Sequence, residues 1–275
     1  MSDPRIVNYD NPLGTQEYKD HHNRQENYVG KNFCFYQTML PLCEFIDQHQ
    51  TDSFTVLITG SDHSDVYQKL IPLFPSTVKW VFYGKKEHWN IPKVNAWAQS
   101  LPDNATVNVQ MFDTAAAREF KQHHQGKLLF LNRIDTRNEN KDRQANVPRD
   151  MQMRKELTEV VRADMTFEEM RPAYDSKEFT VHVGTWFKNV YGLSQTAMIW
   201  LKIDLPKDKY AVRTYETKKW EEIMAFHNEV LRPKYDHKMI QLLVSQYLNL
   251  KPIASFVTSN KTEAQIKHFL NPYVV

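Results

Sequence analysis

The chain has 275 residues, of which 41% are hydrophobic and 25% charged, and its formal net charge is +2. These values exclude a disordered or fibrous protein and are typical of one sizeable α/β domain or two small ones. Two cysteines, Cys34 and Cys43, are too few for a disulfide framework and predict a reducing, cytoplasmic compartment. No apolar run approaches the roughly 20 residues of a membrane span and the N-terminus carries no secretory signal, so no membrane association is expected.

The first half of the chain has the pattern of a parallel sheet. Residues 1-31 are polar and aromatic and predict an irregular N-terminal arm, followed by a single α/β domain over residues 32-275. Helical periodicity over 33–49 precedes a β-branched apolar run at 56–59, which is typical of a buried parallel strand. Further strands are predicted over 78–83, 107–112 and 127–132, with a helix over 114–123. This rhythm predicts a Rossmann-like, mostly parallel sheet with helices on both faces.

The second half is expected to complete the sheet. The charged segment 133–149 has no apolar period and predicts a loop at the carboxyl end of the fourth strand. A helix is predicted over 150–165 and a fifth strand over 179–183. Residues 197–203 and 210–215 are expected to form an antiparallel closing pair, and helices over 220–230 and 238–248 end the chain.

The turn after the first strand is where such a sheet normally receives a ligand, on backbone amides and a helix N-terminus. A ligand-cradling turn usually needs more than one glycine, because the backbone must approach the ligand closely. Here Gly60 and Ser61 are followed by Asp62 and other side chains, and the whole chain has only 7 glycines. The turn Gly60, Ser61 and Asp62 is therefore interpreted as a vestigial cofactor loop, in which Asp62 and Asp65 are better explained as helix caps.

The series of elements, with several local strings in order from about Gln37 onward, resembles a known family. That family is the poxvirus cap-specific 2′-O-methyltransferase, which also serves as the stimulatory small subunit of poly(A) polymerase. No single string is specific, and the resemblance depends on their order. It implies a class I methyltransferase fold. The strings are Gly60-Ser61, Lys79-Trp80, Gly84, residues 127–137, residues 261–264 and residues 269–271.

The same resemblance implies a degenerate member of the family. Active members use a Lys-Asp-Lys-Glu set, in which a neutral lysine removes the ribose hydroxyl proton. The four positions correspond here to Met39, Arg133, Val181 and Ala197. The loop proline and second glycine correspond to His63 and Ser64, and the ribose-binding acid corresponds to Tyr83. No catalytic residue and no S-adenosylmethionine cofactor are therefore expected.

A cap-binding surface is the part of the family's machinery that has partial counterparts. The family holds the methylated guanine of the cap between two aromatic rings, with carboxylates at its edge. The resemblance implies Trp186 and Tyr18 for the rings and Glu221 for one carboxylate, while the second carboxylate is replaced by Lys188. The alternative is that Trp186 packs hydrophobically at a strand end and that Glu221 is a solvated helix residue.

Six basic residues fall in two predicted loops at one edge of the sheet, where they would bind RNA phosphates in a salt-sensitive manner. Interleaved acidic residues, Glu139 and Asp142, weaken this patch, so a plain solvated loop explains it equally well. The histidines lack carboxylate or cysteine neighbours at ligand spacing, and no metal site is expected. The six residues are Lys85, Lys86, Arg133, Arg137, Lys141 and Arg143.

The resulting hypothesis is a catalytically inactive, methyltransferase-like subunit in viral mRNA end processing. Its partners would be a poly(A) polymerase catalytic subunit, or another viral mRNA-processing protein, together with RNA. Its location would be cytoplasmic, in a viral factory or virion. Two alternatives stay open: an active S-adenosylmethionine-dependent cap 2′-O-methyltransferase with a rearranged site, and a scaffold or host-interaction protein that does not bind RNA.

Overall fold

The computed structural model describes residues 5–17, 33–60, 64–84, 91–134, 146–173, 176–188, 199–204 and 210–259. The strands are β1 (Ile6–Val7), β2 (Phe54–Thr59), β3 (Val78–Tyr83), β4 (Ala105–Asn108), β5 (Leu128–Asn132), β6 (Met165–Met170), β7 (Glu178–His182), β8 (Thr185–Lys188), β9 (Ile199–Asp204) and β10 (Val212–Glu216). The α-helices are α1 (Phe33–His49), α2 (Ser64–Leu70), α3 (Ile91–Ser100), α4 (Thr114–His123), α5 (Val147–Val161), α6 (Thr217–Phe226), α7 (Arg232–Leu248) and α8 (Ala254–Ser259). Short 3₁₀ turns lie at Ile71–Leu73 and Lys251–Ile253, and a π-helical turn lies at His227–Leu231.

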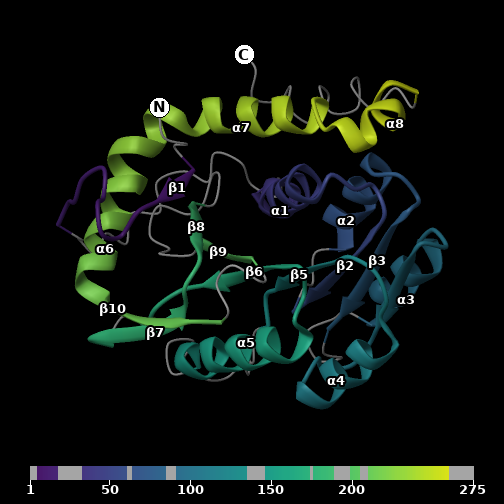
Figure 1. Ribbon diagram of the computed structural model, residues 1–275, viewed down its shortest axis with the longest axis horizontal. Helices are drawn as coiled ribbons and strands as arrows, with labels where there is room; N and C mark the ends of the chain where they lie inside the picture. The colour runs from purple at the N-terminus through teal and green to yellow at the C-terminus, as the bar shows by residue number, and fades with distance from the viewer. Residues whose placement is uncertain are drawn as a thin grey trace.

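The main sheet has eight strands in the order β1-β8-β9-β6-β5-β2-β3-β4. Strands β4, β3, β2, β5 and β6 are parallel, whereas β9 runs antiparallel between β6 and β8. Every residue of β2 and β5 is buried, as expected for parallel strands that helices cover on both faces. The predicted fold class, a Rossmann-like α/β sheet with antiparallel strands at one end, is confirmed (Figure 1).

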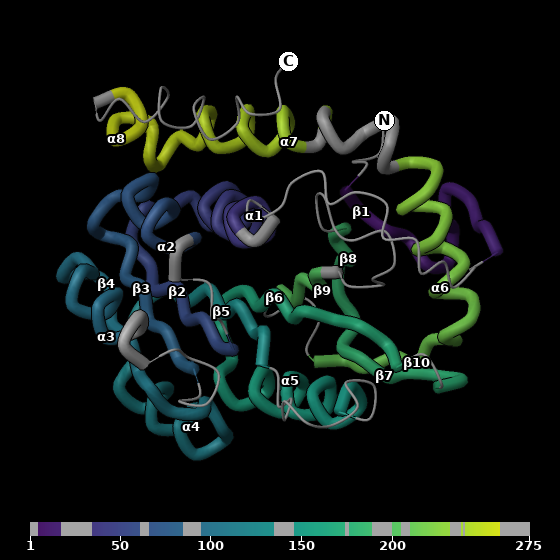
Figure 2. The backbone as a smooth tube through the Cα atoms, turned by 180° about the vertical axis from the view of Figure 1, so that it is seen from behind, coloured from purple at the N-terminus to yellow at the C-terminus, as the bar shows by residue number. Residues whose placement is uncertain are grey.

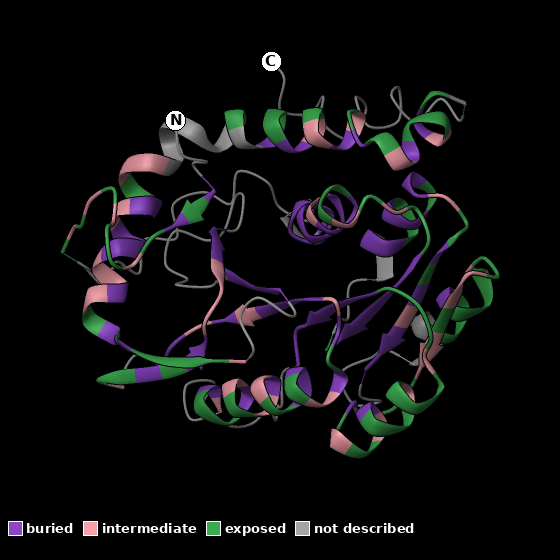
Figure 3. Ribbon diagram, viewed as in Figure 1, coloured by how far each residue is buried: buried purple, intermediate pink, exposed green. Residues whose placement is uncertain are grey.

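Successive side chains of a strand point to opposite faces of the sheet, so the core is divided between the two faces. Val56 and Ile58 of β2 pack in a cluster with apolar residues of α1, α2 and α7, whereas Leu57 packs with residues of α5 on the opposite face. Figures 1 and 2 show α7 lying outside α1 on the first face, and α4 and α5 together on the second. The inward sides of these helices are the buried ones (Figure 3).

Local signals explain the elements that the sequence predicted correctly. Helix α4 has the predicted bounds, because the carboxylate of Asp113 accepts hydrogen bonds from the backbone N–H groups of Ala115 (3.0 Å) and Ala116 (2.9 Å). Strand β3 also spans the predicted residues. The third strand is shorter than predicted and ends at Asn108, while Phe112 beyond it is buried beneath α4 and α5.

The largest differences lie between residues 150 and 215. The predicted helix over 150–165 ends at Val161, where Arg162 adopts a left-handed conformation (φ +49°), and the unpredicted strand β6 follows. The strand predicted over 179–183 is β7, which pairs with β10 in a separate two-stranded sheet. The predicted closing pair is therefore wrong, because β9 pairs instead with β6 and with β8, a further strand that the sequence did not predict.

The N-terminal arm, predicted to be irregular, contributes a strand to the sheet edge. Strand β1 pairs antiparallel with β8, and the backbone N–H of Gln16 donates to the carbonyl of Glu222 on α6 at 3.1 Å. At the other end of the chain, the π-helical turn joins α6 to α7, where the sequence predicted two separate helices. Among the described residues, no helix is long and apolar enough to cross a membrane.

Candidate functional site at the carboxyl ends of the strands

The order of the strands reverses between β2 and β5. After β2 the chain forms β3 and then β4 on one side of β2, and it then crosses to form β5 on the other side of β2. In open α/β sheets, ligands bind outside the carboxyl ends of the strands at such a switch point. Four described residues meet there from different strands. They are Gly60 after β2, Tyr83 at the end of β3, Arg133 after β5 and Glu169 in β6.

Gly60 is required by the packing of the chain on itself. Its φ is +70°, and a Cβ atom there would lie 2.7 Å from the carbonyl carbon of Arg133 and 2.8 Å from the Cα atom of Ile134. Its backbone N–H donates to the carbonyl of Tyr83 at 3.1 Å. Close backbone approach therefore explains this glycine without a bound ligand.

The rest of the predicted cofactor loop precedes α2. Ser61, Asp62 and His63 lie outside the described residues. Ser64 and Asp65 belong to the first turn of α2, although their side chains are not described. The capping role of the two aspartates stays a prediction.

Tyr83 occupies the end of β3, the position that the resemblance assigns to a ribose-binding acid. The residue is buried, and its ring centroid lies 4.6 Å from that of Phe112. Burial, followed by the charge of Glu119, raises the pKa of Tyr83 above its ordinary value. The end of β3 therefore presents a neutral phenol, which cannot supply the charged acceptor of a carboxylate.

An ion pair lies inside the protein at the ends of β5 and β6. The Nε of Arg133 donates to Oε2 of Glu169 at 2.8 Å, and the two side chains are 8% and 13% exposed. The same guanidinium donates to Oε1 of Gln37 at 3.3 Å and lies 5.8 Å from the ring centroid of Trp200. The structure therefore places Arg133, a predicted RNA contact, in the interior with its charge paired.

Sequence reasoning missed Glu169 because it missed β6. The alternation of Met165 and Phe167 with more polar residues was a signal for a strand, but the predicted helix was extended to Met165 and no element was predicted over the rest of β6. Glu169 pairs with Arg133 and Glu168 contacts His182, which explains why two consecutive glutamates occupy an otherwise buried strand.

The described positions that correspond to the family's catalytic set lie in or next to different elements. Met39 is fully buried in the apolar face of α1, and Ala197 lies outside the described residues. Val181 lies in β7, in the two-stranded sheet, whereas the fifth parallel strand of the main sheet is β6. The correspondence at Val181 depended on a strand assignment that the structure corrects.

A buried histidine lies between two carboxylates beside β6. His182 Nδ1 is 3.0 Å from Oε1 of Glu168, and Nε2 is 3.3 Å from Oε1 of Glu159 on α5. Burial alone lowers the pKa of His182, but the hydrogen bonds and charges of Glu168 and Glu159 outweigh it and leave the pKa raised. This contact joins β7 to β6 and α5. No group of described residues is arranged to hold a metal ion.

The structure places the described cap-binding candidates in different surroundings. Trp186 is 4% exposed and packs edge-to-face with Trp220 (centroids 4.1 Å apart) and Tyr215 (4.7 Å). The packing interpretation therefore accounts for this ring, and stacking on a guanine would require the aromatic cluster to open. Glu221 on α6 is partly buried, which raises its pKa.

The other binding candidates divide between the interior and the undescribed segments. Lys188, at the second carboxylate position, is buried and donates to Oδ1 of Asn228. Tyr18 and five of the predicted RNA contacts lie outside the described residues, so their roles stay predictions. The five are Lys85, Lys86, Arg137, Lys141 and Arg143.

The fold has a counterpart among solved structures. It is similar to a chain of the bluetongue virus protein VP4, whose structure is described as revealing a multifunctional RNA-capping production line, with a TM-score of 0.50 and 12% sequence identity. The similarity covers 84% of this chain and 39% of the VP4 chain. No protein-family model matches the sequence, and no curated protein does. At this identity the similarity shows the fold alone, a Rossmann-like α/β sheet that part of the VP4 chain shares.

Proposed function

We propose that this chain is a methyltransferase-like subunit of a viral mRNA-end-processing assembly and that it does not itself transfer methyl groups. The proposal combines the sequence resemblance to the cap methyltransferase and polymerase-subunit family with the fold shared with VP4. Because one fold hosts many functions, the argument for inactivity depends on the site and not on the fold.

The proposal rests on the residues that occupy the switch point. The end of β3 presents the buried, neutral phenol of Tyr83 where a dinucleotide- or nucleoside-binding sheet uses a carboxylate on the ribose. On the other side of β2, the backbone of Arg133 lies directly against Gly60. The carboxylate of Glu169 neutralises the charge of Arg133, so Arg133 does not assist a reaction at this edge. These three features favour a site closed by the protein's own groups.

The test is to titrate the purified chain with S-adenosylmethionine and S-adenosylhomocysteine by calorimetry, and to assay transfer of a labelled methyl group to capped RNA. We expect neither heat of binding up to millimolar ligand nor labelled product. Binding together with product would overturn the proposal and establish the alternative, an active 2′-O-methyltransferase with a rearranged site.

The partner is tested separately. We propose a poly(A) polymerase catalytic subunit of the same virus, with RNA held jointly, because the resembled family assembles in this way. Co-expression should give a heteromer that survives size-exclusion chromatography. Retention of single-stranded RNA by that heteromer should fall as salt is raised. Failure of the two chains to associate would refute this half and favour a scaffold or host-interaction role.

A further inference from the structure

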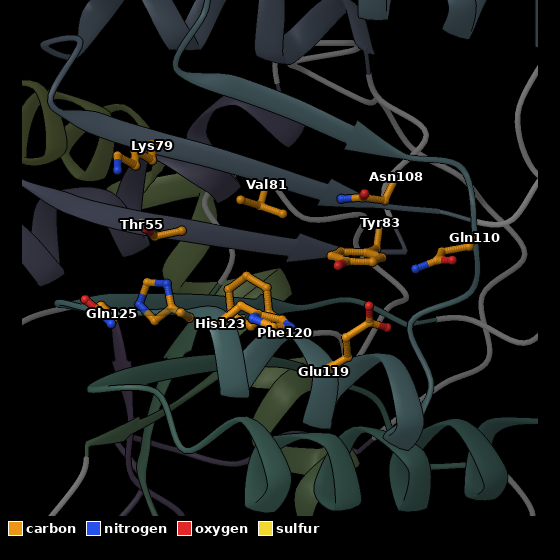
Figure 4. A pocket seen from close by; sticks show the side chains of 11 residues that line it. Thr55, Lys79, Val81, Tyr83, Asn108, Gln110, Glu119, Phe120, His123 and Gln125 are labelled. Atoms are coloured by element: carbon orange, nitrogen blue, oxygen red, sulfur yellow. The ribbon is translucent and has the colours of Figure 1, made fainter.

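A pocket of about 570 Å³ lies on the face of the sheet beside α4. Thr55 of β2 and Val81 of β3 form its floor, and Phe120 of α4 forms its wall (Figure 4). Its volume falls within the roughly 300–1,000 Å³ of ordinary ligand sites. The pocket extends along β3 from the amino end of the strand to Tyr83, so it shares only that residue with the switch point.

The chemistry of the pocket differs between its two ends. Lys79 and Gln125 lie at one end and Tyr83, Gln110 and Glu119 lie at the other, as Figure 4 shows. Since Lys79 and Tyr83 are four residues apart on one strand, the two ends are about 13 Å apart. Lys79 is the one lysine or arginine among the described lining residues. The ligand that fits is therefore elongated, with an anionic group at one end.

The far end offers hydrogen-bond acceptors. Asn108 is held in place because its Nδ2 donates to the carbonyl of Phe82 at 3.3 Å, and its Oδ1 has no partner among the described residues. Glu119, on α4, is exposed and adds a carboxylate. Amide and carboxylate oxygens accept hydrogen bonds from amino groups, and the carboxylate repels a phosphate.

Between the two ends the pocket is apolar. Val81 is half-buried on the floor, and the ring of Phe120 is already stacked on that of His124, with centroids 5.2 Å apart and planes at 9°. An aromatic surface of this kind can stack on any of the planar bases, because every base has a π-face.

We propose that this pocket binds a nucleoside monophosphate, either free or as one nucleotide of an RNA strand, with the phosphate on Lys79 and the base between Val81 and Phe120. The amino group of the base donates to Asn108 and Glu119. Adenine and cytosine are therefore preferred to uracil, which has no exocyclic amino group. The inference does not depend on the proposed function, because it uses neither the methyl-donor site nor a partner protein.

The test is a set of titrations of the whole chain by isothermal calorimetry with AMP, CMP, UMP, adenosine and inorganic phosphate. We expect AMP and CMP to bind more tightly than UMP. Lys79→Ala should weaken AMP binding about tenfold and leave adenosine binding unchanged, since it removes one charge-assisted contact. Lys218→Ala, which removes an exposed lysine of α6 on a different part of the molecule, should change neither.

Glu119→Gln tests the base end. It keeps the shape of the side chain and removes the charge, so the preference for AMP over UMP should shrink while the effect of Lys79→Ala persists. A short oligonucleotide that competes with AMP, and whose affinity also falls in Lys79→Ala, would identify RNA as the source of the nucleotide. Without such competition the ligand is a free nucleotide.

Two results would overturn the inference. One is the absence of AMP binding at millimolar concentration by a chain whose thermal unfolding is normal. The other is AMP binding that Lys79→Ala and Lys218→Ala affect equally. S-adenosylmethionine has no phosphate, so its binding, if insensitive to Lys79→Ala, would count against the proposed inactivity and not against the nucleotide pocket.

Discussion

Replacing Gly60 by alanine should destabilise the protein far more than replacing Gly126 in the same way. Both glycines have positive φ, +70° and +94°. At Gly60 a new Cβ atom would lie 2.7 Å from the carbonyl carbon of Arg133 and 2.8 Å from the Cα of Ile134, whereas at Gly126 nothing lies within 4 Å. The two variants therefore share the conformational strain, and only Gly60→Ala adds a backbone clash.

The magnitudes follow from these two contributions. A left-handed conformation destabilises a residue with a side chain by about 1–2 kcal/mol, which applies to both sites. The alanine also restricts the unfolded chain by a similar amount in both variants, so that contribution cancels in the comparison. Forcing an extra carbon into a packed site costs about 1–3 kcal/mol more, and a backbone neighbour cannot rotate away. We therefore expect Gly60→Ala to lose about 1–3 kcal/mol more unfolding free energy than Gly126→Ala.

Urea denaturation of the wild-type protein and both variants measures the difference. The midpoint should fall most for Gly60→Ala, with an unchanged dependence of unfolding free energy on urea concentration, because the same surface is exposed on unfolding. If the two variants lose the same free energy, the backbone of Arg133 does not press on the turn after β2. The closed switch point would then have no support.

Two further predictions concern charges inside the fold. Glu169→Ala leaves the guanidinium of Arg133 without the carboxylate of Glu169 and should lower the unfolding free energy by about 3–5 kcal/mol. Urea denaturation measures this loss, and a loss below about 1 kcal/mol would contradict burial of the pair. The pKa of His182 is raised in the folded state, so its stabilising effect is fully present below the unfolded pKa of 6.5 and is lost as pH rises through the folded pKa. The difference in unfolding free energy between wild type and His182→Gln should accordingly shrink as pH rises from below 6.5 through the raised folded pKa, and a difference that does not change with pH would refute the assignment.

The elements that the sequence determined by itself are those with purely local causes. Strands β2 and β5 were predictable because a parallel strand buried on both faces is an almost continuous apolar run, and β3 was predictable because all its residues but Lys79 are apolar or aromatic. Helix α4 was predictable to the residue because Asp113 caps it from one position before its start. From such runs and caps the βαβ order, and with it the sheet, could be inferred.

The tertiary structure decided what becomes of polar and aromatic residues whose partners are distant in the sequence. Glu169 pairs with a residue 36 positions away, and β6, the strand that contains it, was not predicted from the local sequence. Trp186 was a plausible stacking ring until Trp220, on another element, was seen to pack against it. Burial of a charge or a ring depends on what the fold brings beside it, so the composition of the switch point followed from long-range packing, which no local pattern encodes.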